Sequence, residues 1–320
     1  MIKYGILSTA SIIDRFVNAI RESECGEVYA IASRTKEKAK IAAERLNIDL
    51  YYGTYEELYN DENIDVIYIP TVNKYHYRDA RNALMHKKHV ILEKPFTMNK
   101  EEAIELFDIA KANNVLLMEG QKCVFLPTNQ KVKELIQSNI IGEVKYIDLQ
   151  AGFPVRFPYD HWMYDLSMGG GSFYGSAAYT IEYMQYLFDT LDLSINGSYV
   201  PSPTGSDEMS HFELVLDHQI LVSSTITMNI PLQNKAKFYG DKGYIEVDHY
   251  WKARKCDVYL YNGEHHHYEY PCDHEFVYEI NHFNECIEKH LLESPIMYKE
   301  KTIQTVDLID SLYKKWKLKA

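Results

Sequence analysis

The chain has 320 residues, of which 46% are hydrophobic and 25% are charged, and its formal net charge is -12. This length suffices for two domains with full hydrophobic cores, and the composition is that of an ordinary soluble globular protein. The negative charge argues against nucleic acid and against an anionic membrane surface as partners.

The cysteines and the apolar runs indicate the compartment. The five cysteines are odd in number and form no Cys-x-x-Cys pair, which favours reduced thiols over a disulfide framework. No apolar run approaches the length of a membrane span, and the chain enters a strand at once without a signal-peptide pattern. We therefore expect a cytoplasmic protein. The cysteines are Cys25, Cys123, Cys256, Cys272 and Cys286.

Strands alternate with helices through the first part of the chain. Such alternation implies right-handed βαβ units and a parallel, doubly wound sheet of the kind that binds nucleotides, and it ends near Gly120. Short apolar runs predict strands at 4–8, 28–33, 66–70, 90–92 and 115–118, and helical periodicity predicts helices at 12–20, 39–46, 75–86 and 101–112.

The second part of the chain is different, because beyond residue 194 it consists mostly of strands joined by turns. Asp217-His218 forms one tight turn, and Asn262-Gly263 is a type I′ hairpin signal. Consecutive hairpins predict an antiparallel sheet, one face of which can be left for a substrate or a partner subunit. Strands are expected at 143–153, 213–216, 220–227, 257–261 and 264–270, and helices at 132–136, 177–187, 277–291 and 302–315.

The run Val90-Ile91-Leu92 leads straight into Glu93-Lys94-Pro95. Open α/β sheets bind their ligands at the carboxyl ends of their strands, and Pro95 disfavours helical geometry at Lys94. Lys94 should therefore be held extended at the mouth of the sheet, where a lysine can bind an anion, bind a hydroxyl or move a proton. On this tripeptide alone, a solvated lysine paired with Glu93 is an equal alternative.

The first strand leads into a turn that should bind a pyrophosphate through backbone N–H groups and a helix N-terminus. The usual Gly-x-Gly-x-x-Gly spacing falls on Ser8, Ala10 and Ile13, so no glycine is present. Ser8 and Ala10 are small enough for close approach of the backbone, whereas Ile13 predicts a wider gap between helix and strand.

The end of the second strand distinguishes the two nicotinamide cofactors. An acidic residue there binds the ribose of NAD, whereas cationic and hydroxyl groups suit the 2′-phosphate of NADP. The chain has Ser33-Arg34-Thr35, with Lys38 one turn further along, and Arg34 suits bidentate phosphate binding. The alternative is that Arg34 and Lys38 are solvated surface residues with no ligand.

Two further positions could carry chemistry. His76 follows the third strand at the sheet edge of Lys94, although a histidine at a helix start is more often structural. Gly169-Gly170-Gly171 leads into a helix with Tyr179, which could act as a general acid beside a lysine. A metal is not expected at His265-His266-His267 with Cys272 and His274, because a surface hairpin explains this cluster better.

These motifs together resemble the Gfo/Idh/MocA family of NAD(P)-dependent oxidoreductases over nearly the whole chain. Within the family, the chain looks most like the branch of dimeric dihydrodiol dehydrogenases and sugar oxidoreductases. The resemblance is carried by 4–10, 31–34, Thr71-Val72-Asn73-Lys74-Tyr75-His76, Glu93-Lys94-Pro95-Phe96, Leu117-Met118-Glu119 and Gly169-Gly170-Gly171.

The resemblance implies an α/β Rossmann domain over 1–121 and an α+β domain with a large, mostly antiparallel open sheet over 122–298. The final helix, about 299–317, would pack on the first domain, and the sheet would form a homodimer. Catalysis would rest on Lys94, Tyr179 and His76. The cofactor would contact Ser8, Thr9, Ala10, Ser11, Ile12, Ser33, Arg34, Thr35, Lys38, Pro70, Thr71, Asn73, Glu93 and Lys94, and the substrate would contact Lys94, Asp160, His161, Trp162 and Tyr179.

The sequence departs from the family pattern at two places. Gly175 stands where the dihydrodiol branch has an aspartate, and Gly120-Gln121-Lys122-Cys123-Val124 replaces an aromatic and arginine stretch. We expect an NADP(H)-preferring oxidoreductase, with NAD as the other candidate cofactor, that acts on a secondary alcohol or ketone of a sugar or cyclic polyol. Two alternatives remain: a weakly active or inactive regulatory protein that binds the cofactor, and an enzyme that keeps its cofactor bound and exchanges hydride between two sugars.

Overall fold

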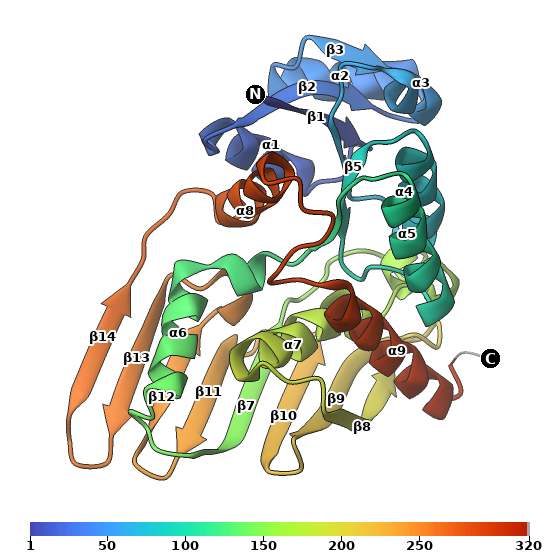
Figure 1. The fold of residues 1–320 in the computed structure, drawn as a ribbon. Helices are drawn as coiled ribbons and strands as arrows, with labels where there is room; N and C mark the ends of the chain where they lie inside the picture. Colours follow the sequence, from blue (N-terminus) through green and yellow to red (C-terminus); the bar gives the residue numbers. More distant parts are fainter. Residues whose placement is uncertain (319–320) are drawn as a thin grey trace. The chain divides into compact units, whose positions relative to one another are not determined.

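The computed structural model describes residues 1–318, and the chain divides into two compact units (Figure 1). The first unit contains Met1–Gln121 and Asp273–Ile303. The second contains Lys122–Cys272 and the residues from Gln304 onward. No helix within residues 1–318 is both long enough and apolar enough to cross a membrane.

The first unit is built on a six-stranded sheet in which every pairing is parallel. β4 is buried along its whole length, as expected for a strand covered on both faces. Because the chain leaves β1 in one direction and β4 in the other, right-handed crossovers place helices on both faces. In spatial order the strands are β3 (Leu50–Tyr52), β2 (Gly26–Ala32), β1 (Ile2–Leu7), β4 (Val66–Ile69), β5 (His89–Glu93) and β6 (Leu117–Gly120).

The sequence did not predict β3 or the short helix α3 (Tyr55–Asn60). Both are too short to show a clear hydrophobic period. The start of α3 nevertheless had a signal, because Thr54 and Glu57 form a capping box. The other helices between β1 and β6 are α1 (Ile13–Glu22), α2 (Lys36–Leu46), η1 (Asn73–Tyr75), α4 (His76–Met85) and α5 (Lys100–Ala112).

Helix α8 (Val277–Glu288) belongs to the first unit. The Tyr4 hydroxyl donates to Asn284 Oδ1 at 2.6 Å, and the rings of Phe16 and Phe276 meet edge to face at 5.6 Å. The sequence had assigned this helix to the second domain. A period of 3.6 shows that a helix has a buried face but does not show which sheet covers it.

The second unit contains an eight-stranded sheet that is antiparallel except where β7 pairs with β10. One face is covered by α6 (Pro127–Gln137) and α7 (Ser172–Phe188) (Figure 1). Helices packed on a mostly antiparallel sheet are the α+β architecture that the sequence predicted. In spatial order the strands are β14 (His265–Glu269), β13 (Lys255–Leu260), β12 (Gly243–Asp248), β11 (Lys235–Gly240), β7 (Val144–Gly152), β10 (Ile220–Thr227), β9 (Asp207–Leu216) and β8 (Leu193–Pro201).

The two hairpin turns correct one expectation. At Asp217-His218 both residues have positive φ, 49° and 55°, which is the signature of a type I′ turn. At the Asn262 hairpin only Gly263 has a positive φ, 97°, while Leu260 O accepts from Gly263 N and Leu260 N donates to Glu264 O. This is a type I turn with a glycine bulge, and the type I′ prediction was wrong because Asn262 does not have a positive φ.

The last helix, α9 (Lys299–Lys315), begins in the first unit, but most of it belongs to the second. Tyr313 donates to Asp207 at 2.7 Å, and Trp316 Nε1 donates to Gly197 O at 2.9 Å. The end of this helix therefore packs within the second unit, whereas the sequence predicted that the helix packs on the first domain. The aromatic side chains near its end pack with Phe173 of α7, which accounts for the difference.

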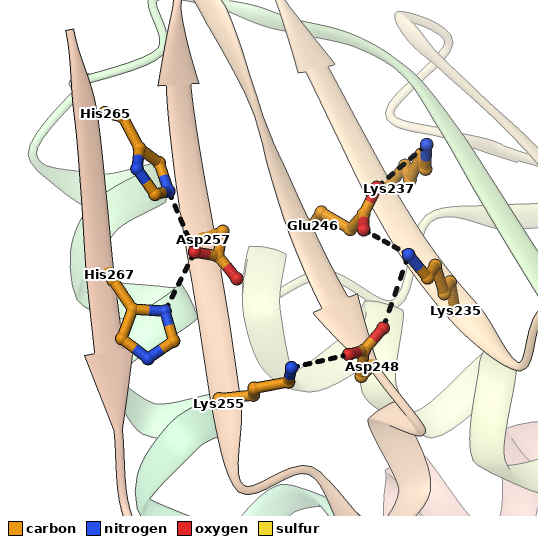
Figure 2. A network of polar contacts seen from close by, with 8 residues as sticks. All are labelled: Lys235, Lys237, Glu246, Asp248, Lys255, Asp257, His265 and His267. Atoms are coloured by element: carbon orange, nitrogen blue, oxygen red, sulfur yellow. Dashed lines mark hydrogen bonds and ion pairs between the residues drawn. The ribbon is translucent and has the colours of Figure 1, made fainter.

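The sheet face opposite these helices is polar. Figure 2 shows a row of ion pairs across β11 to β14, in which Lys237 and Lys235 contact Glu246 and Lys255 contacts Asp248. A parallel row of tyrosine rings crosses the same strands and includes Tyr239 and Tyr244 at 5.7 Å. Charged and aromatic cross-strand pairs of this kind stabilise a sheet face that is not covered by the chain itself.

Candidate functional site

The turn after β1 has the geometry of a phosphate-binding loop despite its missing glycines. Ser8 has a φ of 100°, in a region that favours glycine. Its N–H donates to Ala32 O at 2.9 Å, and its hydroxyl accepts from Ala10 N at 3.2 Å. Ser8 therefore takes the conformation of the first fingerprint glycine, held by its own side chain.

The helix that follows this turn begins without a side-chain cap. Ile12 occupies the cap position of α1, whereas Thr35 and Asn99 cap α2 and α5 through their side chains. An uncapped N-terminus directs backbone N–H groups and the positive end of the helix dipole toward an anion. The segment from Thr9 to Ile12 thus fits a pyrophosphate.

The end of β2 presents Arg34 to solvent, while Ser33 is buried. Burial raises the pKa of Tyr55, and the positive charges of Arg34 and Arg78 oppose that rise, so both guanidinium groups act on the same tyrosine. The Thr35 hydroxyl caps α2 by accepting from Lys38 N at 3.4 Å. The side chains of Arg34 and Lys38 are both exposed at this corner of the first unit.

The loops after β4 and β5 lie side by side because these two strands pair in parallel. The Tyr68 hydroxyl donates to Glu93 Oε1 at 2.7 Å and fixes the residue before Lys94. Lys94 itself is half-buried, and its peptide bond to Pro95 is cis. The structure thus places Lys94 at the carboxyl end of β5, as the sequence indicated. Pro70, Thr71 and Asn73 follow β4 on the neighbouring loop.

His76 joins these two loops. It is fully buried, with Nδ1 2.8 Å from Pro95 O and Nε2 2.8 Å from Thr71 O. Burial lowers the pKa of this histidine, and the two carbonyl groups oppose the shift. With one ring nitrogen beside each of these carbonyl oxygens, His76 links the loop after β4 to the loop after β5.

In the second unit, the glycine turn and a buried aspartate set the start of α7. Gly169 and Gly171 have φ values of 77° and 121°, so both need glycine. Asp207 accepts from Phe173 N at 2.7 Å and from the Ser172 hydroxyl at 2.8 Å. Burial raises the pKa of Asp207 to about 6, and these hydrogen bonds oppose the rise. Helix α7 is thereby fixed at its first turn.

Tyr179 lies two turns along α7 and is half-buried. Its hydroxyl accepts a hydrogen bond from Lys122 Nζ at 2.8 Å. Lys122 begins the short helix η2 (Lys122–Phe125) in the same unit. The sequence did not predict this contact, although Lys122 lies in the stretch that departs from the family's aromatic and arginine pattern.

Gly175 lies one turn before Tyr179 on α7. A Cβ atom built at this position meets nothing within 4 Å, and the residue is only half-buried. Residues four apart share one helix face. The position that carries an aspartate in the resembling branch is thus open space beside Tyr179.

The loop before the glycine turn carries the expected substrate contacts. Asp160 is exposed, and His161 and Trp162 are half-buried. The His161 ring stacks on Phe157 at 4.0 Å. This loop packs directly on the glycine turn, because a Cβ at Gly170 would lie 2.5 Å from Trp162 O.

The histidine cluster on the second hairpin makes ion-pair contacts. His265 and His267 both lie 2.8 Å from Asp257 Oδ1, as Figure 2 shows, and His266 lies on the other side near Glu264. Within the part of the chain that the structure describes, no group of three or more His, Cys, Asp or Glu side chains could hold a metal ion.

Comparison with known proteins gives two family matches. Residues 2–121 match the model "Oxidoreductase family, NAD-binding Rossmann fold", and residues 129–246 match the model "GFO/IDH/MocA C-terminal domain". Among curated proteins, trans-1,2-dihydrobenzene-1,2-diol dehydrogenase of Xenopus laevis is 32% identical over 313 residues, which cover 92% of each chain.

Two solved structures share the fold at lower identity. KijD10, a 3-ketoreductase from Actinomadura kijaniata in complex with NADP and TDP-benzene, has a TM-score of 0.88 at 23% identity and covers 98% of this chain and 97% of its own. Aldose-aldose oxidoreductase from Caulobacter crescentus, complexed with glycerol, has a TM-score of 0.88 at 20% identity, with 99% of this chain and 98% of that chain covered.

Proposed function

Because this chain belongs to the Gfo/Idh/MocA family of oxidoreductases, we propose that it is an NADP(H)-preferring enzyme. It would transfer a hydride between the nicotinamide and a secondary alcohol or ketone of a sugar or cyclic polyol. The observation that carries this proposal is Lys94 at the carboxyl end of β5, the edge at which open α/β sheets bind ligands. The names of the relatives, a dihydrodiol dehydrogenase, a 3-ketoreductase and an aldose oxidoreductase, support the substrate class.

The residues of the first unit fit a dinucleotide. Ser8 and the uncapped start of α1 would hold the pyrophosphate through backbone N–H groups. Arg34 would pair with the 2′-phosphate, which supports NADP over NAD. When bound, the nicotinamide supplies hydride chemistry, and the protein supplies orientation and proton handling.

The proton step falls to Lys94 and Tyr179. In oxidation, these groups take the hydroxyl proton while the hydride leaves the same carbon, so an alcohol becomes a ketone. In reduction they return the proton to the carbonyl oxygen. His76 would act indirectly, by fixing the loops after β4 and β5 through Thr71 O and Pro95 O.

The experiment that tests this function is a panel of sugars, polyols and ring ketones, read by nicotinamide absorbance with NADP(H) and NAD(H) in parallel. We expect turnover with at least one cyclic polyol or sugar and a preference for the phosphorylated cofactor. If the purified protein binds NADPH but turns over no member of the panel, the protein is not an enzyme of this class. The alternative that Gly175 favours, a regulatory protein that binds the cofactor, would then apply. Cofactor absorbance that survives purification and gel filtration would favour exchange between two sugars.

We also propose that the enzyme forms a homodimer through the polar face of the eight-stranded sheet, in the cytoplasm. The rows of tyrosine rings and ion pairs across β11 to β14 support the homodimer, because aromatic residues are enriched at interfaces. The five free cysteines support a cytoplasmic location. Tyr244→Glu on this face should convert a dimer to a monomer in light scattering; a monomeric parent protein would contradict the proposal.

A further inference from the structure

We propose that Lys122 is a positioning residue for the proton step, which holds the Tyr179 hydroxyl by a hydrogen bond and favours its ionised form. This inference rests on the proposed function, in which Tyr179 exchanges a proton with substrate. The lysine partner that it gives to Tyr179 lies in the same unit as the tyrosine.

The geometry of the pair is that of a charge-assisted hydrogen bond. Lys122 Nζ lies 2.8 Å from Tyr179 Oη and 5.0 Å from the centre of the tyrosine ring. Lys122 is only 4% exposed, although lysine is seldom buried without a specific partner. An ammonium group removed from water acts strongly on a neighbouring oxygen, and it stabilises the phenolate more than the phenol.

A buried asparagine holds the two residues in register. Asn129 of α6 donates to Cys123 O and to Tyr250 O, each at 2.8 Å, and it accepts from the Tyr183 hydroxyl at 2.9 Å. Cys123 follows Lys122 directly, and Tyr183 lies one turn beyond Tyr179 on α7. Asn129 thus holds both the segment that carries Lys122 and the helix that carries Tyr179. A solvated surface lysine would not need these hydrogen bonds.

Other titratable groups around α7 do not replace this lysine. Burial raises the pKa of the Cys123 thiol and of the Tyr250 phenol far above neutrality, so both stay uncharged at pH 7. Asp207 binds the first turn of α7, and Lys133 of α6 contacts Tyr186 near its last turn. Glu182 of α7 is buried, and its charge opposes that of Lys122 at Cys123. Lys122, by contrast, donates directly to the Tyr179 hydroxyl.

In oxidation, the proton and the hydride leave the substrate for different acceptors. The ionised Tyr179 oxygen accepts the substrate hydroxyl proton, the hydride leaves the same carbon for the cofactor, and Lys122 stays protonated throughout. Removing Lys122 should therefore slow the proton step and shift its pH dependence, while substrate binding changes little.

The test compares Lys122→Met and Lys122→Arg with Lys133→Met in the full-length enzyme. Lys133 is a matched control, because it also packs its ammonium group on a tyrosine ring of α7, at 4.5 Å from Tyr186, but lies away from Tyr179. We expect Lys122→Met to lower kcat for oxidation by about tenfold to a hundredfold, with KM changed by less than about threefold. The acidic limb of its pH profile, on which oxidation speeds up as Tyr179 ionises, should move up by about one pH unit or more. Lys122→Arg should restore part of the rate, and Lys133→Met should match the parent.

A second readout does not need turnover. In protein with isotope-labelled tyrosine rings, the NMR signal that Tyr179→Phe removes identifies Tyr179, and its titration midpoint should rise in Lys122→Met. If kcat, pH profile and midpoint are all unchanged in Lys122→Met, Lys122 is only a packing residue and the inference is wrong. If the parent enzyme turns over no substrate but the midpoint still rises, the inference about the pair stands and the proposed function fails.

Discussion

The two units place their functional residues in different ways. In the first unit, Ser8, Arg34 and Lys94 lie within two residues of the ends of parallel strands, so the end of each strand decides where each residue lies. In the second unit, Lys122 and Tyr179 come from segments 57 residues apart and meet only because Asn129 and Asp207 fix the elements around them. Strand-end sites can thus be recognised from local sequence, whereas a helix-face site depends on long-range packing.

The largest effect is expected at the strand-end site. Lys94→Met should lower turnover by roughly a hundredfold or more, because a group that moves a proton is lost. Affinity for NADPH should change far less. Steady-state kinetics and cofactor titration measure the two effects, with Lys111→Met, exposed near the end of α5, as the control. Full turnover of the best substrate by Lys94→Met would show that Lys94 does not take part in proton transfer.

The helix-face site should respond in the same direction. Tyr179→Phe removes the hydroxyl that accepts from Lys122, and we expect turnover to fall by about tenfold to a thousandfold with little change in substrate binding. Tyr186→Phe on the same helix is the control, since its ring packs against Lys133. A Tyr179→Phe enzyme with parent kinetics would leave the proton step to Lys94.

The cofactor preference tests the strand-end rule separately. Arg34→Ala should weaken NADPH binding by about 1.5–3 kcal/mol, the range for a hydrogen bond to a charged group. NADH binding should barely change, since NADH has no 2′-phosphate. Fluorescence titration of both cofactors decides the point. Equal losses for NADPH and NADH would show that Arg34 does not contact the 2′-phosphate.

The packing that fixes α7 can be tested through stability. The raised pKa of Asp207, about 6, means that the folded state binds its proton more tightly than the unfolded state. The stability that this proton provides is present below about pH 4 and is lost as the pH rises through about 6. Asp207→Asn should remove this slope and destabilise the unit at pH 7 by about 1–3 kcal/mol, because one acceptor becomes a donor.

Chemical unfolding at several pH values measures both effects of Asp207→Asn. Tryptophan fluorescence suits this experiment because Trp162, Trp251 and Trp316 all lie in the second unit. Glu213→Gln, an exposed carboxylate on the same strand, is the control. An unfolding free energy with the same pH slope as the parent would contradict the role given to Asp207.

The smallest effect is expected at Gly175. The position is helical and open, so Gly175→Asp should fold normally and change stability by less than about 1 kcal/mol. A carboxylate one turn before Tyr179 should raise activity toward trans-dihydrodiols relative to sugars. The same substrate panel and a thermal melt measure the two outcomes. Loss of folding would show that the open space is needed by the native structure.

The parallel sheet, the antiparallel sheet, and the places of Lys94, Arg34 and Tyr179 on their elements could be predicted from the sequence. These features depend on hydrophobic period and on strand ends, which are local properties of the chain. Even Ser8, in place of a glycine, could be located because the turn follows the first strand.

The partners of these residues became visible only in the folded chain. The two ring nitrogens of His76 each lie 2.8 Å from a backbone carbonyl oxygen, and Lys122 donates to Tyr179. Helix α8 joins the first unit, whereas Tyr313 and Trp316, at the end of the chain, pack in the second. A hydrophobic period shows that a face is buried, but which surface buries it, and which side chains then meet there, depends on contacts between residues far apart in the chain.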